Sequence, residues 1–78
     1  MSTMTWHVEV TFTEDENRTR ADAILVLRGS HFHGFGQAKR APDDPSVPIV
    51  GEELAAARAL SDLAHKLLDA AAERIATF

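Results

Sequence analysis

Two histidines separated by one residue, His31 and His33, are the first candidates for chemistry in this chain. In an extended strand their side chains point to the same side, a spacing that can chelate a divalent metal ion. His7 has the same orientation on an earlier segment, but in a three-stranded sheet it would lie two strands away, about 9–10 Å. A weak metal or small-ligand site is therefore one hypothesis. An exposed pair, or a pair buried in a subunit contact, is the interpretation that we prefer.

The other reactive residue types do not form a catalytic arrangement. The chain has no cysteine, and Ser30 beside His31 has no recognisable orienting acid or oxyanion hole. The acidic groups at 14–16 and 43–44 lie in a turn and a linker, where water would give all of them the same environment. The two glycines at 34 and 36 are too few for a dinucleotide-binding motif. We therefore expect no enzyme activity, no catalytic residues, no metal ion and no cofactor.

The composition of the 78-residue chain is that of one small domain, residues 1–78. Hydrophobic residues make up 45% of the chain, which indicates a folded globule. The formal net charge of −4 argues against tight non-specific binding to nucleic acid, and no DNA partner is expected. There is no apolar run of membrane-spanning length and no signal-peptide pattern near Met1. We expect a cytoplasmic protein with no membrane partner.

Three segments alternate between apolar and polar residues and predict β-strands at 5–13, 18–28 and 31–39. The apolar side of the first strand consists of Trp6, Val8, Val10 and Phe12. The buried side of the second strand is left open, because both sides are apolar: one has Ala21, Ala23, Leu25 and Leu27, and the other has Ile24 and Val26. The connections between the strands are short, which predicts an antiparallel meander.

One long helix is predicted over about residues 49–77, after a linker at 41–48 that contains all three prolines. Arg58, Asp62 and Lys66 are spaced four residues apart and are expected to form a ladder of alternating charge on the solvent face. The expected fold is therefore α+β, with the order β-β-β-α. It is a three-stranded antiparallel meander with one long C-terminal helix packed on one face.

The length and the apolar arc of this helix predict a homodimer. About 28 helical residues reach ~42 Å, whereas strands of eight to ten residues reach about 26–33 Å. The apolar residues cover about half of the helical wheel, more than the ~100° of a simple surface helix. Helix or dimer packing is assigned to Leu60, Leu63, Leu67 and Ile75. The first and third strands are both sheet edges, so pairing through an edge competes with pairing through helices. The alternative is an alanine-rich arc that solvent tolerates.

Gly34 and Gly36 leave one side of the third strand nearly bare. We assign Phe32, Gly34, Gly36 and Ala38 to the helix side, where the helix can approach closely. Trp6 and the helix leucines are candidates to fill the space. A β-bulge, or a backbone that a ligand approaches, remains an alternative.

Several stretches together resemble a known family. They are Gly34-x-Gly36-x-Ala38-Lys39-Arg40, Val47-Pro48 and the block GEELAAARALSDLA that begins at Gly51. They are similar to a small actinobacterial family of unknown function whose fold is like that of the double-stranded-RNA-binding domain. The resemblance covers nearly the whole chain and implies a β-β-β-α subunit, usually dimeric. It also implies an association with stress or dormancy and a likeness to ribosome hibernation factors, but no activity or catalytic residue set.

The preferred hypothesis for function is a non-catalytic, stress-related homodimeric interaction protein. A macromolecular partner would meet the open face of the sheet or the basic end of the third strand. The candidate contact residues are Arg20, Arg28, His31, His33, Phe35, Lys39 and Arg40. The alternative is a ribosome- or RNA-associated regulator of the hibernation type, to which these cations would supply charge. Standard double-stranded-RNA binding is not expected, because Glu52 and Glu53 near the helix start would repel phosphate. The simplest interpretation of the basic residues is ordinary solubilisation.

Overall fold

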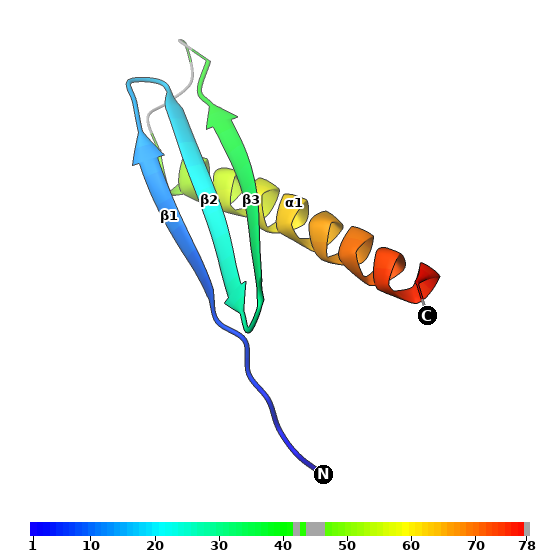
Figure 1. Cartoon of the computed structure of the whole chain (residues 1–78). Helices are drawn as coiled ribbons and strands as arrows, with labels where there is room; N and C mark the ends of the chain where they lie inside the picture. The colour runs from blue at the N-terminus through cyan, green and yellow to red at the C-terminus, as the bar shows by residue number, and fades with distance from the viewer. Residues whose placement is uncertain (42, 44–46, 78) are drawn as a thin grey trace.

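The computed structural model describes residues 1–41, 43 and 47–77. Three strands, β1 (Val8–Glu14), β2 (Arg18–Leu27) and β3 (Ser30–Lys39), form one antiparallel sheet in the order β1-β2-β3. Helix α1 (Pro48–Ala76) follows them and crosses one face of the sheet, with its C-terminal end beyond β3 (Figure 1). The predicted α+β fold, a β-β-β-α meander with one long helix, is confirmed.

The element boundaries differ little from those predicted. β1 begins at Val8 rather than at residue 5, so Trp6 precedes the sheet. The turn between β2 and β3 is made by residues 28 and 29, and Gly29 has a φ of 77°, a conformation that favours glycine. The linker predicted over 41–48 includes residues 42 and 44–46, which lie outside the described residues.

The register of the sheet places the glycines and the alanines on the helix side. Ala21 pairs with Gly36, and Ala23 pairs with Gly34. Pairing is residue for residue from one end of β3 to the other, which excludes a bulge at the glycines. The structure also shows which side of β2 is buried, a question that the sequence left open. The buried side is that of Ala21, Ala23 and Leu25.

The core between sheet and helix is thin. Its buried hydrophobic residues are Ala21, Ala23, Leu25, Ala38, Ala55, Ala59 and Leu63. Leu25 is the largest side chain that is fully buried among the described residues. A small domain without a disulfide and with so few large buried side chains depends on close packing or on self-association for stability.

Close packing is achieved at the two glycines of β3. A Cβ atom on Gly36 would lie 2.5 Å from the backbone nitrogen of Ala59, and one on Gly34 would lie 2.5 Å from the Ala59 oxygen and would also meet the Leu63 nitrogen. The backbone of α1 therefore lies directly on β3. The helix backbone fills the space beside the two glycines, where large side chains were predicted.

The C-terminal part of α1 extends past the sheet (Figure 1). Its last buried residue is Leu63, and every described residue from 71 to 77 is exposed. Leu68 and Ile75 are 66% and 74% exposed. No helix in the described part of the chain is both long enough and apolar enough to cross a membrane.

Candidate functional site

The sheet face opposite α1, the open face, carries a polar cluster centred on Asp22. The Asp22 carboxylate accepts hydrogen bonds from Arg20 Nε at 3.1 Å and from Arg20 Nη2 at 3.0 Å. Asp22 Oδ1 also lies 2.7 Å from His33 Nε2. The Cζ atom of Arg20 lies 4.6 Å from the centre of the Phe35 ring, a cation–π distance. We call Arg20, Asp22, His33 and Phe35 the Asp22 cluster.

The charged groups of the Asp22 cluster are paired with one another by hydrogen bonds. The hydrogen bonds from Arg20 and then from His33 hold the pKa of Asp22 below its usual range, and the bond to Asp22 raises the pKa of Arg20. Asp22 therefore stays ionised at neutral pH and occupies the guanidinium of Arg20. This makes Arg20 a poor candidate for an RNA phosphate contact.

Sequence reasoning missed Asp22, because no carboxylate lies near the two histidines along the chain. The signal that could have found it is the register of the β2–β3 hairpin. With the turn at residues 28 and 29, Asp22 pairs with Phe35 and Ile24 pairs with His33. Asp22 and His33 are therefore diagonal neighbours on one face, within reach of each other.

His31 and His33 both lie on the open face, but their contacts differ. His33 contacts Asp22, whereas His31 is exposed near the β2–β3 turn. Within the described residues, no group of three or more histidine or acidic side chains is arranged to hold a metal ion. In the same part of the chain, no hydroxyl group is hydrogen-bonded to His33 or Asp22.

The basic residues predicted to contact RNA do not form one patch. Arg28 follows the end of β2, whereas Lys39 ends β3 and pairs with Arg18 at the opposite end of the sheet. Arg40 lies at that second end, where its backbone nitrogen donates to the Asn17 oxygen at 2.8 Å. The predicted contact residues are therefore divided between the two ends and the middle of the sheet.

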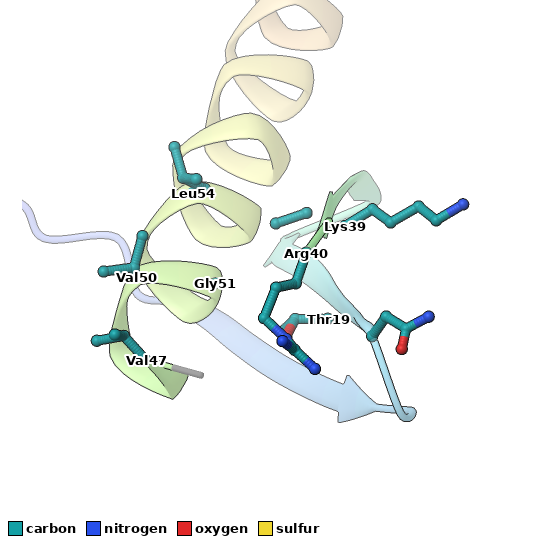
Figure 2. A pocket seen from close by; sticks show the side chains of 9 residues that line it. Thr19, Lys39, Arg40, Val47, Val50, Gly51 and Leu54 are labelled. Carbon is teal, nitrogen blue, oxygen red and sulfur yellow. The ribbon is translucent and has the colours of Figure 1, made fainter. Parts of the chain in front are cut away.

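A pocket of about 310 Å³ lies between the start of α1, the start of β2 and the end of β3 (Figure 2). Val47, Val50 and Leu54 form its helix wall, and Lys39 and Arg40 lie on the strand side. The pocket therefore places an apolar wall beside two basic residues.

Of the charged side chains of α1 that were expected to face solvent, Arg58 and Lys66 are exposed and Asp62 is half-buried, and all three bond to the outer edge of β3. The hydrogen bonds are Arg58 Nη1 to the Gln37 oxygen at 2.7 Å, the Phe35 nitrogen to Asp62 Oδ2 at 2.9 Å, and Lys66 Nζ to the His33 oxygen at 2.6 Å. The Phe35 N–H and then Lys66 lower the pKa of Asp62. Three backbone groups in the middle of this edge strand are thereby occupied by the helix of the same chain.

The other edge strand, β1, is left uncovered. The packing contacts of α1 are with β3 and β2. The register puts Val8, Val10 and Phe12 on the helix side, but Val8 is 40% and Phe12 is 39% exposed. Trp6, just before β1, is 53% exposed. We call Trp6, Val8, Val10 and Phe12 the β1 strip.

The flank of α1 that faces β1 carries an exposed leucine. Arg58 reaches the edge of β3, and Leu60 lies two residues later, about 160° around the helix, on the flank toward β1. Leu60 is 42% exposed. Of the other predicted packing residues, Leu63 is buried in the core, Leu67 is half-buried against it, and Ile75 lies on the overhang. The predicted apolar arc is therefore divided between the core, this flank and the overhang.

Comparisons with known proteins find relatives over most of the chain. A family model described as Rv2632c-like matches residues 4–78. The uncharacterized protein Rv2632c of Mycobacterium tuberculosis is 46% identical over 63 residues, which are 81% of this chain and 68% of that protein. The uncharacterized protein Mb1767 of Mycobacterium bovis is 44% identical over 63 residues, which are 81% of this chain and 67% of that protein.

The same fold has been determined by experiment in a relative. The crystal structure of Rv2632c matches this chain with a TM-score of 0.91 at 39% sequence identity, and the match covers 99% of this chain and 92% of that one. The whole arrangement of three strands and one long helix is therefore shared.

Proposed function

The chain belongs to the Rv2632c-like family, and from that premise we propose that it is a cytoplasmic, non-catalytic interaction protein that works as a homodimer. The relatives named above are uncharacterized proteins, so the family supplies no activity to transfer. The proposal therefore rests on the surfaces of the chain itself. The stress or dormancy role that the resemblance implies rests on that resemblance alone.

The observation that carries the homodimer is the apolar surface left uncovered beside a thin core. Three members of the β1 strip, Trp6, Val8 and Phe12, are exposed, as is Leu60, next to a core in which five of the seven buried side chains are alanines. Burying such surface is the main source of stability in small domains. A second copy of the chain can supply the missing cover.

The open face is the surface that we propose for a macromolecular partner. Val26 is 67% exposed there, and Phe35, the apolar member of the Asp22 cluster, is 45% exposed. An apolar centre bordered by charged groups with fixed positions is typical of protein interaction surfaces. Self-association on the helix side would leave this face accessible in both copies.

The homodimer is tested by measuring the mass of the purified protein by sedimentation equilibrium. A mass of twice 8.5 kDa at micromolar concentration is expected. A mass of 8.5 kDa under those conditions would contradict the proposal.

The alternative function, a ribosome- or RNA-associated regulator, has one observation in its favour. Arg18 and Lys39 are paired across β2 and β3, with Arg40 next along the chain, so three cationic residues lie at one end of the sheet, beside the acidic β1–β2 turn. Co-sedimentation with ribosomes at low salt, weakened by added salt and by Lys39→Glu, would support this function. An absence of pelleting at low salt would remove it.

A further inference from the structure

We propose that the second copy of this chain binds along the free edge of β1, so that the two β1 strands pair antiparallel about a two-fold axis. The two three-stranded sheets then become one continuous sheet, with both helices on the same face. This inference rests on the proposed homodimer and specifies its geometry.

The first argument is the difference between the two edges of the sheet. The outer edge of β3 is occupied by Arg58, Asp62 and Lys66 of α1. No side chain among residues 1–41, 43 and 47–77 makes a hydrogen bond to the outer edge of β1. An edge strand with unpaired N–H and C=O groups is a template for another strand, and among the described residues β1 is the edge strand whose outer groups α1 leaves uncovered.

The second argument is the apolar surface that β1 pairing would bury. Residues directly opposite each other in paired strands lie on the same face, so the two β1 strips would meet side by side. Leu60 of each helix would border them. The strip and Leu60 expose on the order of 400 Å² of apolar surface per copy, about half of the ~800 Å² that each partner gives to a stable interface. The paired backbone edges would supply more, and Met4 and Ile49, which are 84% and 57% exposed, are further apolar surface on each copy.

The third argument is charge, and it sets the direction of pairing. β1 ends at Glu14, and Asp15 and Glu16 follow in the turn. Parallel pairing would place two such acidic turns side by side, where they would repel. Antiparallel pairing places each acidic turn beside the Trp6 end of its partner, and the nearest turn at that end contains Arg28. Only the antiparallel direction also satisfies a two-fold axis.

A pair of charge substitutions tests which surface forms the contact. Phe12→Glu places a carboxylate in the β1 strip, and Ile75→Glu places one on the helix overhang, the competing apolar surface. Sedimentation equilibrium is expected to give a monomer for Phe12→Glu and a dimer for Ile75→Glu, with far-UV circular dichroism unchanged in both. A dimeric Phe12→Glu would overturn the β1 geometry and leave the homodimer standing. A monomeric wild type would overturn the homodimer itself.

Spin-label distances test the geometry without disturbing the strip. The chain has no cysteine, so Thr11→Cys and Gln37→Cys can each carry one label on the open face. Pairing through β1 puts the Thr11 positions near each other across the two-fold axis and the Gln37 positions five strand spacings, about 24 Å, apart. A Gln37 distance shorter than the Thr11 distance would overturn the proposal.

Discussion

At Gly34 and Gly36 the absence of a side chain sets the distance between α1 and β3. The backbone atoms of Ala59 stand where a Cβ atom would have to be placed at either position. A backbone that belongs to a long helix cannot move at one residue without moving its neighbours. The small residues of β2 and α1 complete the contact, because Ala21, Ala23 and Ala55 are each fully buried.

Gly36→Ala is therefore expected to lower the free energy of unfolding by about 1–3 kcal/mol, because the added methyl overpacks the contact. Gly51→Ala is the matched control. Its Cβ would lie 3.1 Å from Thr19 Oγ1, a side-chain atom that can rotate away, and alanine favours the helix by ~1 kcal/mol over glycine. Urea unfolding at equal protein concentration measures both. A Gly36→Ala variant as stable as Gly51→Ala would show that the contact is loose.

Leu63 and Leu68 form a second matched pair on the same helix. Leu63 is 3% and Leu68 is 66% exposed. Leu63→Ala is expected to cost about 2–5 kcal/mol, whereas Leu68→Ala is expected to change the free energy of unfolding by ~0.5 kcal/mol or less. If both variants lose the same free energy of unfolding in urea, Leu68 is packed in the wild type. That result would indicate a contact between copies through the overhang.

Among single residues, the sequence predicts types of environment better than it predicts partners. The bare side of β3 and the packing role of Leu63 follow from spacing, because period and residue size are local properties. The contact between Asp22 and His33 does not follow from spacing, because it needs the register between two strands. Counting from the turn at Gly29 would have supplied that register.

At the scale of the element, α1 does more than cover the sheet. One flank hydrogen-bonds to the backbone of β3, the middle fills the core, and the other flank leaves Leu60 beside the β1 strip. A helical wheel predicts an apolar arc but not which strand each flank meets, because that depends on where the helix crosses the sheet. The strands and the helix themselves were predictable from alternation and composition, with the largest error at the start of β1.

The bond between Asp62 and the Phe35 N–H makes the docking of α1 depend on pH. The pKa of Asp62 is lowered in the folded protein, so its contribution to stability is present above the usual aspartate pKa of about 3.9 and is lost as pH falls through the lower folded value. Asp62→Asn keeps an oxygen acceptor but removes the charge. The variant is expected to melt below wild type at neutral pH, and the difference in Tm is expected to narrow below about pH 4. A difference that stays constant down to acidic pH would contradict this role.

The whole molecule is an elongated body, 53 × 27 × 20 Å, with one layer of sheet and one helix. A shape of this kind has much surface for its volume, and its thin core leaves large side chains exposed on the helix side. Cysteine is absent, so no disulfide adds stability, and the proposed homodimer would add apolar burial between copies. The length of the helix predicts self-association, but the sequence does not predict which surface forms the contact between copies.

Folding linked to dimer formation predicts that the Tm rises with protein concentration, because dilution favours the unfolded monomer. Thermal melts over a hundredfold range of concentration are expected to shift upward for wild type. The same series is expected to be flat for Phe12→Glu. A concentration-independent Tm in the wild type would mean that each copy is stable alone.

The hydrogen bonds from α1 to the edge of β3 tie the solubility of the protein to the docking of its helix. If α1 lifts away, the backbone groups of β3 lose their partners at the moment when the bare glycine face is uncovered. A flat, unprotected strand with little side-chain bulk can stack against identical strands of other molecules. Helix release in this protein is therefore a route to fibrillar aggregation, and acid below the usual aspartate pKa of about 3.9, which neutralises Asp62, is the condition under which thioflavin fluorescence should first reveal it.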